Sequence, residues 1–526
     1  VRGNAVLSAP PGSSKTTRVP LVLLDAPWLA GRRIVLLEPR RPAARLAAAH
    51  MAGILGERVG ETLGYQVRFE RRIGPHTRIE VVTEGILIRR LQQDPELAGV
   101  GLLIFDEFHE RSLQADLGLA LALDVVAGLR PDLRLLIMSA TLDTGAAARL
   151  LGGAPVIQGE GRAWPVEITY AERTPGPDPV EAVVTAVRQA LIRHDGDVLA
   201  FLPGAGEIER ARTRLVPLLG SDTLVLPLHG SLSLEEQDLA LGARRGGGRR
   251  VVLATDIAET SVTIEGVSVV VDCGLTRKPR FAPASGLTRL VTEPVSRASA
   301  DQRAGRAGRL GPGVCYRLWT REQEAGRPEH RPAEILQADL APLALDLALW
   351  GLRDPGELAW LDPPPTPAWE AAVALLRDLD ALDAGGGITP LGRRMAETPL
   401  HPRLARMLVA ARDAATRRLA ADLAALLSER DPWVSAPGLP RPADLGPRLQ
   451  ALEAQRQGHR TPGLDGRRLA GIDRLARQLC PPARDQAATA ATQDPAALLA
   501  LAYPDRVARR REEGDGRYLL ASGPGA

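Results

Sequence analysis

The sequence of 526 residues is poor in cysteine and has no long apolar run. Its three cysteines, Cys273, Cys315 and Cys480, are too widely spaced for a disulfide framework or a zinc knuckle, so we expect three buried thiols. The longest apolar stretch, residues 117–129, is shorter than a membrane span and contains Asp124. We therefore expect no membrane span and no signal segment, and we predict a cytoplasmic protein without a membrane partner.

Lysine and aromatic residues are also scarce. Of 66 basic residues only Lys15 and Lys278 are lysines. Genome bias explains the abundance of arginine, but the ammonium kept at Lys15 suits a point contact with phosphate better than a planar guanidinium does. Aromatic residues make up 3% of the chain, so base stacking is not the main means of binding nucleic acid. The formal net charge of +3 is nearly neutral for a chain of this length, so a polyanionic partner has to bind at local basic patches.

Short apolar strands alternate with helical stretches over residues 5–165. The predicted strands are residues 4–8, 34–38, 79–83, 102–106 and 133–139. Continuous apolar strands separated by helices predict a parallel sheet covered on both faces, whose ligands bind at the carboxyl ends of the strands. Residues 180–320 repeat this alternation, which predicts a second sheet domain.

After residue 325 the composition changes: the sequence is rich in Leu and Ala with helical periodicity, and proline interrupts it. Within it, residues 385–397 (GGGITPLGRRMAE) predict a small hairpin-and-helix unit. The predicted fold class is α/β, with two tandem parallel-sheet domains followed by mostly α-helical accessory domains. The predicted domain ranges are 1–170, 171–325, 326–400 and 401–526. Both ends of the sequence resemble truncation points, so we expect a fragment of a longer protein.

Residues 8–17 (SAPPGSSKTT) resemble a phosphate-binding loop of the pattern GxxxxGK[ST], with Ala9 and Ser14 in place of the two glycines. Such a loop gathers backbone N–H groups around a phosphate at a helix N-terminus, and its lysine and hydroxyl complete the phosphate and metal contacts. The alternative is an ordinary Gly/Ser/Pro turn that enters a helix. The retained Lys15 favours the phosphate loop.

An acid pair, Asp106-Glu107, follows an apolar strand. Beside a phosphate loop the two carboxylates divide the work, because Asp106 holds Mg²⁺ directly or through water while Glu107 polarises the attacking water. A solvated acidic turn is the alternative for such a pair in isolation.

Residues 302–309 (QRAGRAGR) give the strongest single signal. Arginines three residues apart lie on one face near a predicted helix start, from which they reach a γ-phosphate bound by the other domain. In an arginine-rich chain the alternative is a basic surface face, which the glutamine and glycines at this spacing disfavour.

These motifs occur in the order SAPPGSSKTT, EPRR, TEGIL, DEFHER, SAT, FLPGAGEIE, TDIAETSVTI and QRAGRAGR. Over residues 5–320 this order resembles a DEAH-type (DExH) superfamily 2 helicase, and DEFHERSLQADLGLAL with PLHPRLARML resembles the bacterial HrpB type of that family. The resemblance implies two RecA-like domains, then a winged helix over 326–400 and a helical bundle over 401–526, with a truncated carboxy-terminal region.

The resemblance also implies site residues. The residues that bind ATP or another NTP are Gly12, Ser13, Ser14, Lys15, Thr16, Thr17, Asp106 and His109, with Mg²⁺ held by Thr16 and Asp106. Glu107 and Gln302 act on the water, and Arg306 and Arg309 contact the γ-phosphate. Ser139 and Thr141 couple nucleotide state to domain closure. The residues that contact single-stranded nucleic acid are Arg40, Arg41, Thr83, Gly85 and Thr255, together with Arg277, Lys278 and Arg280 of a strand-separating hairpin within residues 276–289. Ordinary surface charge is the alternative for the hairpin cations.

Four positions depart from the family pattern. Ser14 replaces a glycine, which costs little only if its backbone is right-handed, as we expect at the opening of a helix. Asp256 and Asp301 replace asparagines and add negative charge where phosphates are expected, which weakens anion contact. His50 stands in place of a base-stacking arginine, so we expect poor discrimination among bases.

The sequence therefore predicts a monomeric, ATP-dependent RNA helicase or remodelling enzyme that moves along single-stranded nucleic acid and prefers RNA to DNA. Two alternatives stay open. One is a nucleic-acid-binding scaffold whose NTP hydrolysis is impaired by Ser14 and Asp256, and the other is a DNA translocase. The sequence does not identify protein partners.

Overall fold

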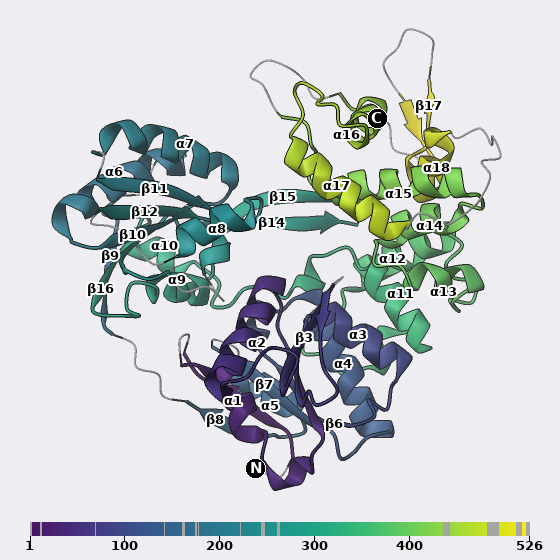
Figure 1. The fold of residues 1–526 in the computed structure, drawn as a ribbon, viewed down its shortest axis with the longest axis horizontal. Helices are drawn as coiled ribbons and strands as arrows, with labels where there is room; N and C mark the ends of the chain where they lie inside the picture. The colour runs from purple at the N-terminus through teal and green to yellow at the C-terminus, as the bar shows by residue number, and fades with distance from the viewer. Residues whose placement is uncertain are drawn as a thin grey trace. The chain divides into compact units, whose positions relative to one another are not determined.

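The computed structural model describes residues 3–10, 13–68, 70–140, 143–159, 164–173, 176, 178–220, 222–242, 248–259, 264–283, 285–434, 442–480, 494–511 and 518–521. The chain divides into two compact units. The first unit comprises Val1–Ala338 and Gly356–Pro363, and the second comprises Asp339–Pro355 and Pro364–Ala526. The first unit contains two separate parallel sheets, and the second is mostly helical (Figure 1).

The first sheet has eight strands in the order β4-β3-β5-β2-β6-β7-β1-β8. All neighbouring strands are parallel except β3 and β4. The strands are β1 (Ala5–Ser8), β2 (Arg33–Leu37), β3 (Leu63–Val67), β4 (Glu70–Arg72), β5 (Ile79–Val82), β6 (Val100–Phe105), β7 (Arg134–Ser139) and β8 (Val156–Gln158). The accompanying helices are α1 (Lys15–Leu23), α2 (Arg41–Leu55), α3 (Glu84–Gln93), α4 (Leu113–Gly128) and α5 (Thr144–Leu150), with short 3₁₀ turns η1 (Pro27–Leu29) and η2 (Phe108–Glu110).

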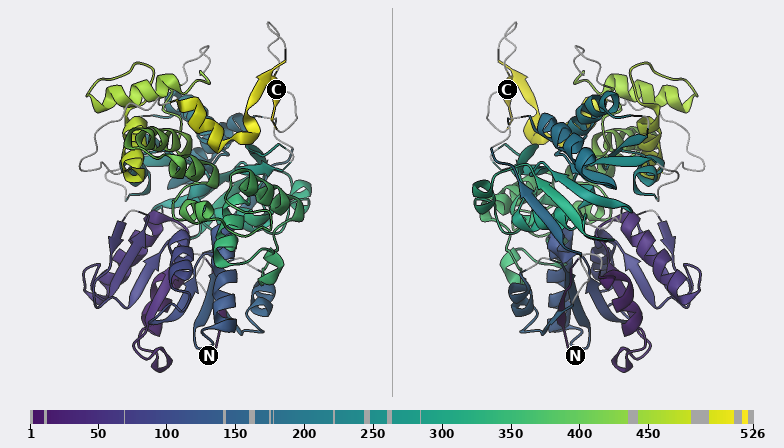
Figure 2. Two further views of the ribbon diagram at one scale, coloured as in Figure 1. Left: turned by 90° about the vertical axis from the view of Figure 1, so that its right-hand side faces the viewer. Right: turned by 90° about the vertical axis from the view of Figure 1, so that its left-hand side faces the viewer.

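Helices cover both faces of this sheet, as the sequence predicted (Figure 2). On one face, Ile34 and Leu36 of β2 pack with Ala48 and Met51 of α2. On the other face, α3 packs against α4, where Gly118 lies close to Phe105 of β6. Because successive strand residues point to opposite faces, a strand buried on both sides must be apolar throughout, which explains the continuous apolar runs.

The second sheet has six parallel strands in the order β11-β12-β10-β13-β16-β9. They are β9 (Val166–Tyr170), β10 (Asp197–Phe201), β11 (Thr223–Leu228), β12 (Arg249–Ala254), β13 (Val267–Asp272) and β16 (Gly313–Arg317). The helices and 3₁₀ turns are α6 (Pro179–Arg193), α7 (Ala205–Leu215), α8 (Leu234–Leu241), α9 (Arg297–Ala304), α10 (Arg321–Ala325), η3 (Val216–Leu218), η4 (Asp256–Ala258) and η5 (Glu334–Leu336). Val198 and Ala200 pack under α6 and α7, whereas Leu199 and Phe201 pack on the opposite face with α8 and α9.

An antiparallel hairpin leaves the second sheet domain after β13 (Figure 1). Its strands are β14 (Leu275–Ala282) and β15 (Leu287–Pro294). Most residues of β15 are exposed. The hairpin predicted within residues 276–289 is therefore present.

The second unit is built on α11 (Ala341–Trp350), α12 (Thr366–Asp378), α13 (Pro390–Ala396), α14 (Pro402–Ala410), α15 (Ala414–Ser428), α16 (Gly446–Arg456), α17 (Gly466–Leu479) and α18 (Pro495–Ala502), with η7 (Pro504–Arg506), β17 (Ala508–Arg510) and β18 (Tyr518–Leu520). A bridge between Leu382 and Ile388 precedes α13, which confirms the small hairpin-and-helix unit. Among the described residues, no helix is long and apolar enough to cross a membrane.

Three expectations need correction. Val166–Tyr170 pairs with β16, so this strand belongs to the second sheet although the predicted boundary places it in the first domain. The arginine motif does not lie at a helix start, because α9 ends at Ala304 and the motif continues through turns beyond it. Cys273 and Cys315 are buried as predicted, but Cys480 is only partly buried.

Candidate nucleotide and nucleic-acid site

The predicted phosphate loop connects β1 to α1, at the carboxyl end of the first sheet. Ser14 precedes the helix with φ 58° and ψ 22°, which is left-handed, so the expected right-handed conformation is wrong. The loop that enters α1 takes a positive φ at this position, which glycine adopts without cost and serine does not. Thr17 Oγ1 donates to the Ser14 carbonyl at 3.3 Å. Gly12 lies outside the described residues, and Ser13 follows a turn in which its N–H donates to the Pro10 carbonyl at 3.3 Å.

Lys15 and Thr16 meet the acid pair at the end of β6. The Lys15 ammonium is buried and lies 3.2 Å from Glu107 Oε1, and Thr16 Oγ1 donates to Asp106 Oδ2. Burial lowers the pKa of Lys15, but the Glu107 and Asp106 carboxylates raise it more, so the amine stays charged. Burial and the neighbouring Glu107 raise the pKa of Asp106 to about 6, despite the opposing effects of Lys15 and Thr16. The structure thus brings together residues that are about ninety positions apart in the chain.

His109 lies between Glu107 of the acid pair and the end of β7. Glu107 has a left-handed backbone with φ 49°. Burial raises the pKa of Glu107, but Lys15 and then His109 lower it more, so it is a carboxylate at neutral pH. His109 Nδ1 lies 3.4 Å from Glu107 Oε2 and accepts a hydrogen bond from the Ala140 N–H. Ser139 is buried beside the phosphate loop, where its carbonyl accepts the Ala9 N–H at 3.0 Å, and Thr141 lies outside the described residues.

Gln302, Arg306 and Arg309 come from the second sheet domain. Gln302 and Arg306 are buried, and Arg306 Nε donates to the Glu259 carbonyl at 3.1 Å. Burial lowers the pKa of both arginines, and the Glu107 carboxylate of the first sheet domain opposes this effect at each of them. The Glu107 carboxylate thus favours the charged form of both arginines. Gly308 permits this turn, since a Cβ there would lie 2.5 Å from the Trp164 carbonyl.

A cavity of about 290 Å³ lies between His109 and Gln302. Residues of both sheet domains line it, including Asp143 of the first and Glu259 of the second. Gln302 therefore lines the same cavity as His109 and Glu110, which follow Glu107 in the chain.

The predicted nucleic-acid contacts of the first sheet domain lie at strand ends. Arg40 precedes α2, and its guanidinium donates to the Ile257 carbonyl at 3.3 Å and pairs with Glu110 at 3.2 Å. Arg41 opens α2, Thr83 is the residue before α3, and Gly85 lies in the first turn of α3. Thr255 follows β12 of the second sheet and precedes η4.

The hairpin cations all have carboxylate partners. Arg277 forms two hydrogen bonds of 3.2 Å with Glu207 of α7. Lys278 Nζ donates to Asp256 Oδ2 at 2.5 Å. Arg280 pairs with Glu293 of β15. Binding of phosphate at these cations must therefore compete with an internal carboxylate.

The departures from the family pattern have structural explanations. The negative charge of Asp256 is met by Lys278, and that of Asp301 by Arg317 of β16, so neither is an uncompensated charge. His50 is exposed on α2.

Sequence reasoning missed two buried carboxylates. Glu38 follows β2, and burial, Asp106 and Glu107 raise its pKa well above the usual value. Glu259 also has a buried carboxylate, and its backbone carbonyl accepts a hydrogen bond from Arg306 Nε. Glu38 is part of the quoted EPRR motif and Glu259 of TDIAETS, but nothing local marks either as buried.

Two parallel-sheet domains in tandem, with a phosphate loop and acid pair in one and a glutamine-arginine motif in the other, define the class of two-domain RecA-like nucleotide-dependent proteins. Three family models match this chain: DEAD/DEAH box helicase over residues 2–149, Helicase conserved C-terminal domain over 181–311, and the winged-helix Helicase associated domain (HA2) over 372–400. The chain therefore carries a DEAD/DEAH box helicase domain followed by a helicase C-terminal domain and a helicase-associated winged helix.

Two relatives from Escherichia coli (strain K12) are similar to the chain. The ATP-dependent RNA helicase HrpB is 46% identical over 521 residues, covering 99% of this chain and 61% of the relative. The ATP-dependent RNA helicase HrpA is 36% identical over 442 residues, covering 81% of this chain and 33% of the relative. The chain thus spans about three fifths of the first relative and a third of the second.

Two solved structures of E. coli HrpB also match. One, described as a DExH-box NTPase, has a TM-score of 0.82 at 46% identity and covers 99% of this chain and 62% of its own. The other, described as a DEAH/RHA helicase, has a TM-score of 0.83 at 45% identity and covers 100% of this chain and 64% of its own. These likenesses agree with the predicted fold of two parallel-sheet domains followed by helical domains.

Proposed function

We propose that this protein is an ATP-dependent RNA helicase or remodelling enzyme that couples NTP hydrolysis to movement along single-stranded nucleic acid. The observation that carries the proposal is the meeting of Lys15 and Thr16 with Asp106 and Glu107 at 3.2 Å or closer. The full-length relatives named above are described as RNA helicases, which supports the choice of RNA.

Each residue of the acid site has a distinct task in the proposed reaction. Lys15 leaves Glu107 to contact the β- and γ-phosphates, and this exchange frees the Glu107 carboxylate to accept a proton from the attacking water. The oxygens of Thr16 and Asp106 fit Mg²⁺, which prefers hard oxygen ligands and takes its remaining ligands from phosphates and water. The metal, when bound with the nucleotide, would neutralise charge on the phosphates.

The second sheet domain completes the proposed site. Gln302 orients the water, while Arg306 and Arg309 stabilise the charge that develops on the γ-phosphate. His109 Nδ1 accepts the Ala140 N–H and lies 3.4 Å from Glu107 Oε2, so we expect a shift of the acid pair to displace the ring and with it the end of β7. We propose that Ser139 and Thr141 transmit this shift to domain closure.

The nucleic acid would be bound chiefly through its phosphates by Arg40, Arg41, Thr83, Gly85, Thr255 and the hairpin cations. Contacts of this kind position a strand without reading its bases, so we expect weak sequence preference and strong salt dependence. We further propose that the protein is a monomer of the cytoplasm. We also propose the four predicted domain ranges, with one change: the second sheet domain begins with the strand that starts at Val166.

The test is phosphate release from ATP and Mg²⁺ with and without single-stranded RNA or DNA. Hydrolysis that rises with RNA and is lost in Lys15→Ala supports the proposal. Arg18→Ala is the matched control, because Arg18 is an exposed cation in the next turn of the same helix. Stimulation by DNA alone would favour the translocase.

An impaired scaffold is the second candidate, favoured by the left-handed Ser14. It predicts retained binding of single strands without hydrolysis. Restored hydrolysis in Ser14→Gly would then identify the serine as the cause.

A further inference from the structure

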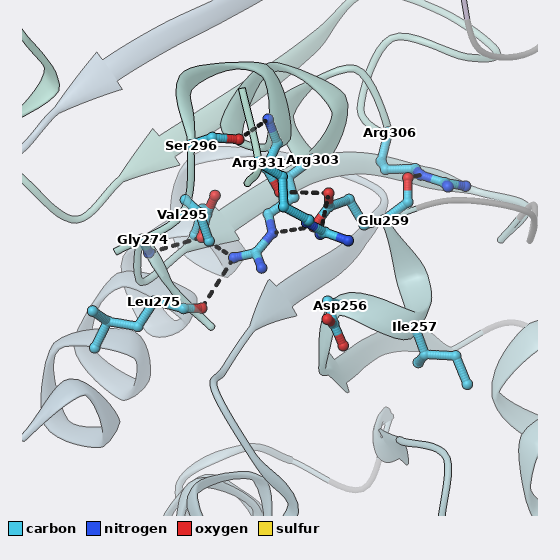
Figure 3. Close-up of polar contacts among 12 residues, drawn as sticks. Asp256, Ile257, Glu259, Gly274, Leu275, Val295, Ser296, Arg303, Arg306 and Arg331 are labelled. Atoms are coloured by element: carbon cyan, nitrogen blue, oxygen red, sulfur yellow. Dashed lines mark hydrogen bonds and ion pairs between the residues drawn. The ribbon is translucent and has the colours of Figure 1, made fainter. Parts of the chain in front are cut away.

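Glu259 occupies a central position in the second sheet domain (Figure 3). Its side chain is buried and accepts hydrogen bonds from Ser299 Oγ, from Arg303 Nε at 3.1 Å and from Arg331 Nη2 at 3.1 Å. Its backbone carbonyl faces the other way and accepts Arg306 Nε. Glu259 therefore contacts three side-chain donors through its carboxylate and Arg306, the predicted arginine finger, through its backbone carbonyl.

The backbone of Glu259 lies at the end of a short turn. It follows the end of η4, and its N–H makes a single turn bond of 3.1 Å to the Asp256 carbonyl.

Two of the three donors are fixed within the sheet domain. Arg303 also donates to Asp272 at 2.9 Å and lies over the Phe201 ring at 4.7 Å, so it is immobilised on several sides. Ser299 lies with Arg303 on α9. Ser299 holds Oε1 of the carboxylate and Arg303 holds Oε2, and Arg331 is a second donor to Oε1.

Arg331 differs because it comes from outside the sheet and α9. It lies in the connector, residues 326–338, through which the chain runs from α10 towards the helical unit. Burial raises the pKa of Glu259, but Arg331 and Arg303 lower it more, so the carboxylate is charged. Both guanidinium groups lie 3.1 Å from it.

We propose that Arg331 is a positioning residue that sets the place of Arg306 through Glu259, so that the connector tunes nucleotide hydrolysis. Removing Arg331 takes one of two donors and a positive charge from Oε1 of Glu259, leaving Ser299 at Oε1 and Arg303 at Oε2. We expect the resulting shift of Glu259 to move the carbonyl that accepts from Arg306. A displacement of about 1 Å at a catalytic group is enough to reduce turnover by 10-fold to 100-fold. The inference rests on the proposed NTP hydrolysis.

The test compares Arg331→Gln with Arg331→Lys in steady-state phosphate release. We expect kcat to fall about 10-fold in Arg331→Gln, with KM for ATP within about 2-fold, because the phosphate loop is untouched. Arg331→Lys should recover most of the activity, since one ammonium hydrogen bond replaces the single contact made by Nη2. Arg297→Gln is the matched control, because it removes an exposed arginine that pairs with Glu329 of the same connector at 3.9 Å.

A double-mutant cycle separates positioning from general support of the fold. If Arg331 acts through Arg306, then Arg331→Gln causes no further loss in an Arg306→Ala background under single-turnover conditions. An equal loss in both backgrounds, or unchanged kcat in Arg331→Gln, would overturn the inference while leaving the proposed function intact. Absence of hydrolysis in the unmodified chain would instead refute the proposed function, and this inference with it.

Discussion

Asp256→Asn should tighten the binding of single-stranded nucleic acid and steepen its dependence on salt. Lys278 donates to Asp256 at 2.5 Å, and the two side chains are 26% and 31% exposed. Burial raises the pKa of Asp256, but Lys278 lowers it more, so the pair is charged at neutral pH. A phosphate that binds Lys278 therefore displaces a carboxylate and releases no bound counter-ion from that cation.

The substitution keeps the shape of residue 256 and removes the competing charge. One additional phosphate contact changes the slope of log K against log salt by about −0.7 for a single strand. A partly exposed ion pair contributes about 0–1 kcal/mol, so removal of the competitor should tighten binding by up to about 5-fold at low salt. Raising salt from about 50 to about 200 mM should then weaken the variant about 3-fold more than the unmodified chain.

The assay is fluorescence anisotropy of a labelled single-stranded oligonucleotide at several salt concentrations. The gain should disappear in the double variant with Lys278→Gln. Asp178→Asn controls for net charge, because Asp178 pairs with Arg210 at 3.6 Å on the surface of the same sheet domain. The reasoning is refuted if Asp256→Asn leaves affinity and slope unchanged while Lys278→Gln alone flattens the slope.

Three further predictions concern the first sheet domain. Glu107→Gln should abolish phosphate release but preserve binding of a nucleotide analogue, because the amide oxygen still accepts from Lys15; unchanged turnover would remove Glu107 from the mechanism. Ser14→Gly should raise the free energy of unfolding by about 1 kcal/mol and strengthen nucleotide binding, since φ 58° strains a serine; a lower melting temperature would contradict this. Burial raises the pKa of Glu84 to about 7 in the folded protein, which therefore holds a proton there that the unfolded chain has released. The stability that this proton contributes is lost as the pH rises through 7. Glu84→Gln should remove this dependence and flatten the melting temperature between about pH 5 and 8.

The sequence was sufficient to predict the parts of the site that follow from local pattern. Apolar strands such as Val100–Phe105 end where polar motifs begin, and parallel strands bring their carboxyl ends to one edge. The glutamine-arginine motif was identified by composition and spacing, although it lies at the end of α9, which finishes at Ala304, and not at a helix start as predicted.

The remaining features depend on contacts between distant residues. Lys278 meets a carboxylate 22 positions away, and Arg331 one that is 72 positions away, so no local pattern predicts either partner. The left-handed Ser14 was missed for another reason. The conformation of a residue before a helix depends on the path of the loop that enters it, whereas the sequence around Ser14 favours only the helix itself.

The pairing of cations with internal carboxylates also bears on coupling between the two sheet domains. Arg40 illustrates this, because its guanidinium binds Glu110 of its own domain and the Ile257 carbonyl beside Asp256 in the other. If a nucleic-acid phosphate takes Arg40 as proposed, the bond to Ile257 must be exchanged at the same time. Binding of the strand would then loosen a contact between the domains next to Thr255, on the same turn that leads to Glu259 and Arg306. If these roles hold, a nearly neutral chain would gain a route from strand binding to Arg306 that a surface with unpaired cations would lack.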